Sequence, residues 1–275
     1  VRSHGLRGTA ELINSRFNLL WQGRRSALPR HKTLQAMLDW SYNLLSESER
    51  RVLYRLSVFV GPFQMEAAHW IAADTVLTEA EVTAAIASLS DKSLLSPSIL
   101  NGSSYLRLLD TTRTYASAKF SESGEVNDVS RKLAEYLIAQ LKRNNERQNG
   151  RWAMDSDLIQ VGNMRTALSW AFSQAGEGEL GVRLAALAAP HLLELSLLDE
   201  CHRWCQAALL RLGLHESTTT HLILQEALAI SALFTRRNGD EVRIPIEQGL
   251  RLAQTLNDPG RELKLLAGLH ILMCH

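Results

Sequence analysis

The protein has 275 residues, of which 45% are hydrophobic and 21% charged; this suits a globular protein with one large domain or two to three small ones. Its 30 Lys and Arg residues nearly balance its 29 Asp and Glu residues, and a net charge of +1 argues against a dedicated nucleic-acid binder. Three cysteines are too few for a disulfide framework, and no apolar stretch reaches the roughly 18 residues that cross a bilayer, so we expect a cytoplasmic protein without a membrane partner.

The two ends of the chain read like the interior of a longer polypeptide. Residues 1–5 do not resemble a signal peptide, and residues 265–275 keep a helical apolar pattern without a stop signal. We therefore expect both ends to be cut from a larger protein.

Two helices are predicted before residue 46. The first covers residues 9–21, and the second covers residues 34–45 with Thr33 as its N-cap. In the second helix Trp40 shares one stripe with Met37 and Leu44, so we assign Trp40 to the hydrophobic core. The alternative is that Trp40 lies on a face that docks on another domain.

The next segment has the element order of a winged helix. Three helices are predicted in succession, over residues 46–59, 65–72 and 78–89. The first and third open with capping boxes, in which Glu follows a Ser or Thr N-cap by three residues: Ser46 with Glu49, and Thr78 with Glu81. Two short apolar runs then flank Asn101 and Gly102, a pair that favours a hairpin turn because both residues tolerate positive φ.

The rest of the chain is predicted to be helical. A helix over residues 111–121 ends before Gly124, which suits the C′ position. Seven more helices follow, over residues 126–144, 157–173, 180–195, 200–212, 221–236, 241–256 and 260–273. Such helix pairs with short polar turns are typical of an α-solenoid, so the predicted fold is mainly α: a winged-helix domain with a small β-hairpin, followed by a TPR-like α-solenoid.

Seven runs of the sequence resemble one protein family. They read RHKTL at 30–34, LDWSYNLL at 38–45, RLSVFVGPF at 55–63, EAA at 66–68, LLDTTRTYA at 108–116, SGE at 123–125 and NMRTALSWA at 163–171. Together they resemble the STAND-class, NB-ARC-like bacterial transcriptional regulators, over about residues 12–209 of this chain.

The resemblance implies one part of a modular signalling protein. Such regulators often combine a DNA-binding domain, a P-loop ATPase, a winged helix that packs on the ATPase and holds ADP, and TPR-like repeats that receive a signal. The resemblance implies these parts here: residues 1–32, the end of the ATPase lid region and a linker; 33–124, the winged-helix domain; 125–154, a connecting helix and linker; 155–275, TPR-like repeats that continue beyond this chain.

The resemblance also implies the partners of the chain. They are the parent's own nucleotide-binding domain in cis and an unknown protein or small-molecule signal on the repeats. DNA would be bound only through a domain outside this chain.

The ATPase chemistry itself is expected to lie outside the chain. A P-loop needs G-x-x-x-x-G-K-[ST], and Gly-Lys never occurs here, so we predict no enzymatic activity and no cofactor for the chain, with ATP or ADP bound by the parent. The candidates for contact with the parent's nucleotide-binding domain are Arg30, His31, Asp110 and Arg113. Leu109 stands where many relatives place a His that reaches ADP, and Leu cannot donate a hydrogen bond.

Three other interpretations were compared with this one. A DNA-binding winged helix is the first alternative, but its recognition-helix candidate, residues 78–89, has two Glu and no Lys or Arg, which favours a protein partner. A TPR-like scaffold without an ATPase is the second. A metal site at His191, Cys201, His202 and Cys205 is disfavoured because no second close pair completes a tetrahedral set.

Overall fold

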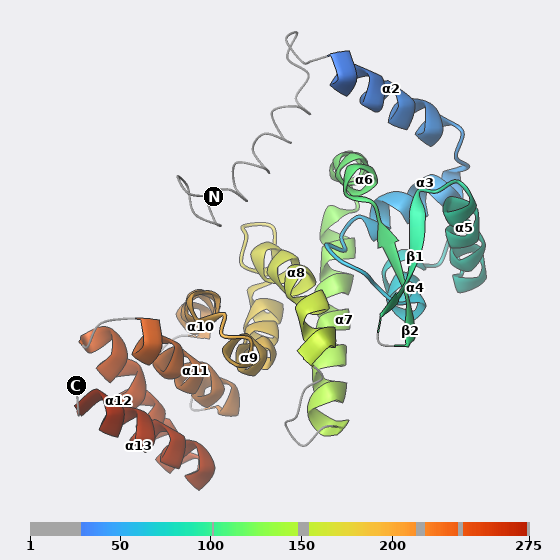
Figure 1. Ribbon diagram of the computed structural model, residues 1–275. Coiled ribbons are helices and arrows are strands. Elements are labelled where there is room, and N and C mark those ends of the chain that lie inside the picture. The colour runs from blue at the N-terminus through green and yellow to red at the C-terminus, as the bar shows by residue number, and fades with distance from the viewer. Residues whose placement is uncertain (1–28, 101, 148–153, 213–217, 236–238, 274–275) are drawn as a thin grey trace. The chain divides into compact units, whose positions relative to one another are not determined.

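The computed structural model describes residues 29–100, 102–147, 154–212, 218–235 and 239–273, without the side chains of residues 29–34, 145–147 and 154–159. In this part of the chain the fold is mainly helical, with one antiparallel two-stranded sheet (Figure 1). Residues 1–50 and residues 51–275 form two separate compact units. The helix predicted over residues 9–21 lies outside the described residues.

The first unit contains α2 (Pro29–Asn43), which begins before the predicted N-cap Thr33. Proline is favoured in the first turn of a helix, where its missing N–H costs nothing. Residues 35–43 of α2 include no buried side chain, and Trp40 is 68% exposed. The assignment of Trp40 to the core is therefore wrong. The apolar stripe exists, but helical spacing shows only that residues share a face and not what covers that face.

The capping box at Ser46 is confirmed at the start of α3 (Glu47–Leu56). The Ser46 N–H donates to Glu49 Oε2 at 2.8 Å, and the Glu49 N–H donates to Ser46 Oγ at 3.2 Å. The helix ends at Leu56, three residues earlier than predicted, because residues 57–59 close a tight turn with bonds to carbonyls three residues back.

The winged-helix order predicted from the sequence is confirmed. After α3 come α4 (Met65–Ala72), α5 (Glu79–Asp91), β1 (Leu95–Leu100) and β2 (Ser103–Leu108). The second capping box holds the start of α5, since Thr78 and Glu81 bond reciprocally. Gly102 has a φ of +76° in the turn between the strands, as the hairpin requires.

The hairpin is joined to the helices by one bridge that the sequence did not predict. The strands pair with Leu95 opposite Leu108, and both side chains are buried. Phe63, just before α4, pairs with Leu106: its N–H donates to the Leu106 carbonyl at 2.9 Å and its carbonyl accepts from the Leu106 N–H at 2.7 Å. Phe63 also stacks on Phe59, with ring centroids 4.5 Å apart. This bridge fixes the hairpin against the loop between α3 and α4.

A buried arginine connects three segments of the second unit. Arg55 of α3 is 5% exposed. Its Nη1 donates to the Ala72 carbonyl, its Nη2 to Asp74 Oδ2 and its Nε to Glu125 Oε2, each at 2.6 Å. Asp74 follows α4, and Glu125 lies between α6 (Asp110–Glu122) and α7 (Val126–Arg147). One guanidinium therefore holds α3, the loop before α5 and the α6–α7 turn together.

The pKa values of the two carboxylates reflect this pairing. Burial alone would raise the pKa of Asp74, but the hydrogen bonds from Arg55 and from the Val76 and Leu77 amides outweigh it and lower the pKa to about 2. Burial would also raise the pKa of Glu125, but the hydrogen bond and the charge of Arg55 outweigh burial, and the pKa of Glu125 is lowered. Both carboxylates are therefore ionised at neutral pH and balance the buried cation.

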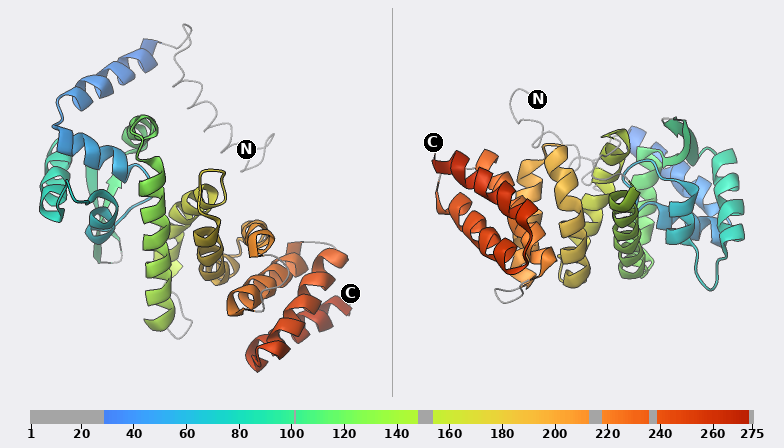
Figure 2. Two further views of the ribbon diagram at one scale, coloured as in Figure 1. Left: turned by 180° about the vertical axis from the view of Figure 1, so that it is seen from behind. Right: turned by 90° about the horizontal axis from the view of Figure 1, so that it is seen from below.

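The helical region continues from α7 without a further strand among the described residues. It contains α8 (Met154–Ala171), α9 (Gly178–Glu194), α10 (Leu198–Leu212), α11 (Thr219–Thr235), α12 (Asp240–Thr255) and α13 (Pro259–Met273), each within about three residues of its predicted bounds. Each helix packs on the next, while α9 also contacts α11 and α11 contacts α13. Figure 2 shows these helices, coloured yellow to red, side by side. Nearest and next-nearest contacts of this kind are what stacked helical hairpins produce.

Arg55→Met should destabilise the chain by roughly 3 kcal/mol, because it removes the buried cation that pairs with Asp74 and Glu125 and the donor to the Ala72 carbonyl. The measurement is urea unfolding. Arg131→Ala is the matched control, since Arg131 pairs with Glu177 at 2.5 Å with both side chains more than 40% exposed, and such pairs contribute at most about 1 kcal/mol. Equal losses in the two variants would contradict a special role for Arg55.

The stability of the chain should fall below neutral pH because of His191 in α9. His191 is 1% exposed, and burial lowers its pKa from 6.5 to about 4. Between these two values the unfolded chain binds more protons than the native one, so the free energy of unfolding decreases as pH falls through this window. His191→Gln should reduce the difference in the free energy of unfolding between pH 7 and pH 4 by on the order of 3 kcal/mol. Urea unfolding at the two pH values measures this difference.

The exposed His270 supplies the control for this prediction. His270→Gln should leave the slope between pH 7 and pH 4 unchanged. A His191→Gln variant with the parental slope would show that other groups cause the loss. The titration of Asp74 falls in a separate window, because its pKa of about 2 places the corresponding loss below pH 4.

Candidate interaction site

The exposed face of α5 is the surface that a winged helix would present to DNA. Glu79, Glu81 and Asp91 are exposed on this helix, together with Thr83, Ala84 and Ala87. Its buried face carries Val82, Ala85, Ile86 and Leu89. The helix has no Lys or Arg from Glu79 to Asp91, so its surface is acidic to neutral.

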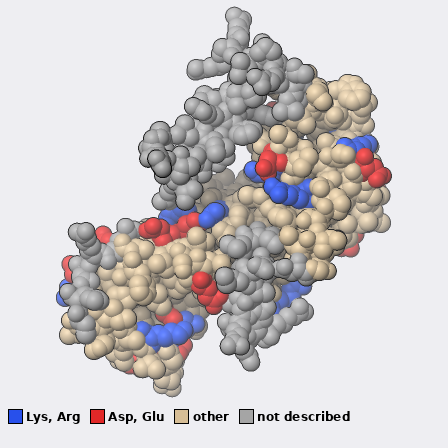
Figure 3. Space-filling model, in the orientation of Figure 1, with Lys and Arg blue, Asp and Glu red and all other residues tan. Residues whose placement is uncertain are grey.

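The wing adds little positive charge to this face. Its tip carries Ile99, which is 79% exposed. The cations of this region are Lys92 after α5 and Arg107 in β2, and Arg107 already lies 3.5 Å from Asp110. In the view of Figure 3, blue and red side chains occur in small mixed groups over the tan surface. The described part of this face therefore offers no broad basic surface.

The structure places two of the four predicted nucleotide-domain contacts together. Asp110 and Arg113 both lie in the first turn of α6. Asp110 is exposed, whereas the Nε atom of Arg113 is buried and has no hydrogen-bond partner in the described structure. Arg30 and His31 lie in the first turn of α2, in the other unit, and their side chains are outside the described residues.

The start of α6 also exposes an apolar residue. Leu109 is the N-cap of α6, makes no side-chain capping bond and is 49% exposed. An N-cap normally carries a polar side chain, so Leu109 is unfavourable for the helix alone. A single exposed Leu is ordinary on a protein surface, so Leu109 alone does not mark an interaction site.

A tight joint connects the winged helix to α8. The Val60 N–H donates to Asn163 Oδ1 at 2.9 Å, and Asn163 is 1% exposed. At the neighbouring Gly162, an added Cβ would lie 3.0 Å from Val60 Cβ, so glycine allows the close approach. No local sequence pattern predicts this joint, although Val60 and Asn163 belong to two of the runs that carry the family resemblance.

The cysteines of α10 form a buried pair. Cys201 and Cys205 are free thiols with Sγ atoms 3.9 Å apart. Its hydrogen bond with Cys201, together with burial, raises the pKa of Cys205 well above its usual value. The burial of both thiols and the raised pKa of Cys205 are typical of small core residues and disfavour thiolate chemistry. The described residues contain no group of three metal-binding side chains.

A comparison with protein families supports the assignment of the first half of the chain. Residues 45–120 match the family model described as a winged helix-turn-helix domain. This range covers α3 to α6 and the hairpin. The chain thus contains a winged helix-turn-helix domain, followed by a helical region in which no described helix is long and apolar enough to span a membrane.

Named relatives place the chain among homologues of bacterial regulators. It is 29% identical over 275 residues to "Putative HTH-type transcriptional regulator Rv0890c" of Mycobacterium tuberculosis (strain ATCC 25618 / H37Rv), which covers 97% of this chain and 31% of that protein. "Putative HTH-type transcriptional regulator Mb0914c" of Mycobacterium bovis matches to the same extent. "Uncharacterized protein Rv0894" of M. tuberculosis is 36% identical over 126 residues, 46% of this chain and 32% of that protein.

The chain therefore spans about a third of the length of the curated relatives that it matches. No solved structure matches it significantly.

Asn163→Ala should loosen the joint between the winged helix and α8. It removes the acceptor of the part-buried Val60 N–H, and the loss of such a hydrogen bond costs about 0.5–1.5 kcal/mol. Amide hydrogen exchange should show lost protection at Val60. Asn127→Ala is the control, because Asn127 accepts an exposed hydrogen bond from Trp170 at 3.1 Å, and this change should leave Val60 protected. Unchanged exchange at Val60 in Asn163→Ala would contradict the assignment.

Proposed function

We propose that this chain is the regulatory and interaction module of a larger STAND-type, ATP-dependent bacterial transcriptional regulator. The observation that carries the proposal is a winged helix-turn-helix domain whose α5 presents acidic and small residues instead of cations. Relatives named as HTH-type transcriptional regulators, about three times longer than this chain, support a role in gene regulation. In this proposal the protein acts in the cytoplasm.

The proposed mechanism is restraint of a nucleotide-binding domain that lies elsewhere in the parent. The winged helix would pack on that domain and keep ADP bound, and the helical region, which we take as TPR-like, would receive a signal that loosens the packing. Arg30, His31, Asp110 and Arg113 are the proposed contacts in cis. The chain would then have no catalytic role and no cofactor of its own, with ATP or ADP held by the parent.

The exposed apolar face of α2 supports contact with another domain. Trp40 and Met37 of α2 are 68% and 61% exposed, and Leu44, directly after the helix, is 61% exposed. A cluster of large apolar side chains in water is unfavourable, and such patches mark interaction surfaces. Their removal from water by a docked domain would supply the stabilisation that this face lacks in the chain alone.

Trp40→Ala tests the proposal in two measurements. In the isolated chain it should shift the melting temperature by only about 2 °C, because exposed side chains contribute little packing. In the full-length parent the same change should accelerate ADP release and raise basal reporter transcription. Trp204→Ala is the control for a buried tryptophan, since Trp204 is 8% exposed and stacks on Phe172, and it should cost about 3–5 kcal/mol.

Two outcomes would sink this proposal. One is a large loss of stability in Trp40→Ala, which would return Trp40 to the core. The other is a parent gene without a P-loop upstream of residue 1, which would leave a TPR-like scaffold unconnected to an ATPase.

DNA binding by this winged helix is the second candidate function, and the class of its fold favours it. Phosphates would meet Glu79, Glu81 and Asp91 on α5, and like charges repel. We expect no tight binding of the chain to duplex DNA in a gel shift at about 150 mM salt. Tight, salt-dependent retardation that is lost in Arg107→Ala would favour the DNA-binding alternative.

A further inference from the structure

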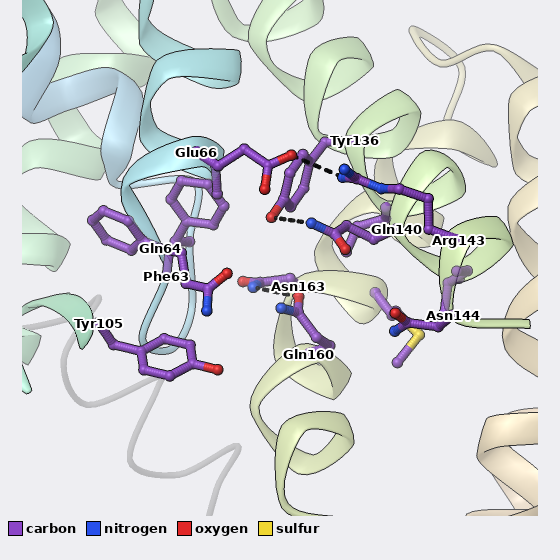
Figure 4. A pocket seen from close by; sticks show the side chains of 15 residues that line it. Phe63, Gln64, Glu66, Tyr105, Tyr136, Gln140, Arg143, Asn144, Gln160 and Asn163 are labelled. Atoms are coloured by element: carbon purple, nitrogen blue, oxygen red, sulfur yellow. Dashed lines mark hydrogen bonds and ion pairs between the residues drawn. The ribbon is translucent and has the colours of Figure 1, made fainter. Parts of the chain in front are cut away.

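A cavity lies between the winged helix and the first two helices of the helical region. Its volume is about 280 Å³. The winged helix contributes Phe63, Gln64 and Tyr105, while α7 and α8 supply the opposite wall (Figure 4). The joint residue Asn163 belongs to that wall. The cavity is thus built from both parts of the second unit and adjoins the bond that joins them.

Several hydrogen-bonding side chains in this cavity are not used by the protein. Gln64, Tyr105 and Asn144 line it, and no side-chain hydrogen bond to another described residue is formed by any of them. Figure 4 shows the Gln64 amide and the Tyr105 hydroxyl directed toward the pair formed by Gln160 and Asn163. Unused donors and acceptors that converge on one space are typical of a small-molecule site.

Other polar groups of the wall are already fixed. Gln140 Nε2 donates to the Tyr136 hydroxyl at 2.7 Å, and Asn163 Nδ2 donates to Gln160 Oε1 at 3.3 Å. Tyr136 is 3% exposed, and its ring lies 6.0 Å from that of Trp70. These bonds hold one side of the cavity rigid, which reduces the entropy lost when a ligand binds.

The charges of the cavity select against an ionic ligand. Its charged lining residues are Glu66 and Arg143, which pair at 2.9 Å. The remaining polar wall is made of amides and phenols, which carry no charge at neutral pH. Both side chains of this pair are about half exposed, 41% and 53%, so the pair faces solvent and leaves no uncompensated charge to attract an ionic ligand.

We propose that this cavity binds a small uncharged ring compound that carries several hydroxyl or amide groups, the chemistry shared by nucleosides and monosaccharides. The volume lies just below the roughly 300 Å³ at which drug-sized sites begin, which suits a compound of one or two small ring systems and excludes a peptide. The amide and phenol side chains of the wall offer both hydrogen-bond donors and acceptors, and so do the hydroxyl and amide groups of such a ligand. The bound compound would contact both sides of the joint at Asn163 and stabilise it.

Fluorine NMR of the whole chain labelled with 3-fluorotyrosine tests this proposal. The chain has five tyrosines, and Tyr105→Phe and Tyr136→Phe assign the two resonances of the cavity. Adenosine and glucose are the neutral probes, with adenosine monophosphate and glucose 6-phosphate as charged counterparts. We expect saturable shifts at Tyr105 and Tyr136 with one neutral probe, unchanged signals at Tyr54 and Tyr115, and at least tenfold weaker binding of its phosphorylated form. The probe that binds identifies the nucleoside or the sugar as the source.

Gln64→Met removes the amide but keeps the length of the side chain, and it should weaken binding about two- to tenfold. Gln206→Met, on an exposed position of α10, should leave binding unchanged. The proposal is overturned if neither neutral probe shifts the cavity tyrosines up to its solubility limit, or if the phosphorylated forms bind equally well. Since binding is read on this chain alone, the result is independent of the ATPase proposal.

Discussion

The guanidinium of Arg55 is the interaction on which the arrangement of the second unit depends. Each of its three nitrogens bonds to a different segment: the end of α4, the loop before α5 and the turn before α7. Three separate nitrogens in a rigid planar fork reach these acceptors, whereas a lysine would have to reach all of them from one nitrogen, so the two residues are not interchangeable here. Lys132 of α7 adds a bond to the Ala73 carbonyl at 2.6 Å. The orientation of α7 relative to the winged helix is thus set by buried polar groups, which tolerate less displacement than apolar contacts do.

The position of α8 follows from that of α7. The two helices pack on each other, and α8 then reaches back to the winged helix through Asn163 and Gly162. The loop after α3 is therefore held from two sides: Arg55 lies at its start, and Val60 lies against α8. A displacement of α8 would have to break the Val60 bond or move the loop. This contiguous contact offers a physical route by which a change in the helical region could reach the winged helix.

The features that the sequence predicted are those fixed by short-range chemistry. The capping boxes at Ser46 and Thr78 and the C′ glycine Gly124, with a φ of +77°, each depend on residues within a few positions, and all are confirmed. The bridge between Phe63 and Leu106 and the network of Arg55 join residues more than 40 positions apart in at least one contact, and no local pattern encodes them. The prediction that Trp40 is buried was wrong for a related reason, because helical spacing shows which residues share a face but not which surface covers that face.

Less of the candidate site than of the fold could be predicted from the sequence. Asp110 and Arg113 share a helical turn, as their spacing indicates, but no local pattern pointed to the cavity or to the joint.

The winged helix-turn-helix class does not by itself decide what this domain binds, since one fold serves many functions. Duplex binders commonly neutralise about 6–10 phosphates, and each neutralised phosphate adds affinity through counterion release. From α5 to the end of β2 the sequence has two cations, Lys92 and Arg107, and the second already pairs with Asp110. Two cations in a segment that also carries Glu79, Glu81 and Asp91 fall well short of that number. The same face has small side chains, Ala80, Ala84 and Ala87, which allow close approach of another protein surface without the desolvation cost of long charged groups. The chemistry of this surface therefore supports the proposed protein partner, although the fold belongs to a class that commonly binds DNA.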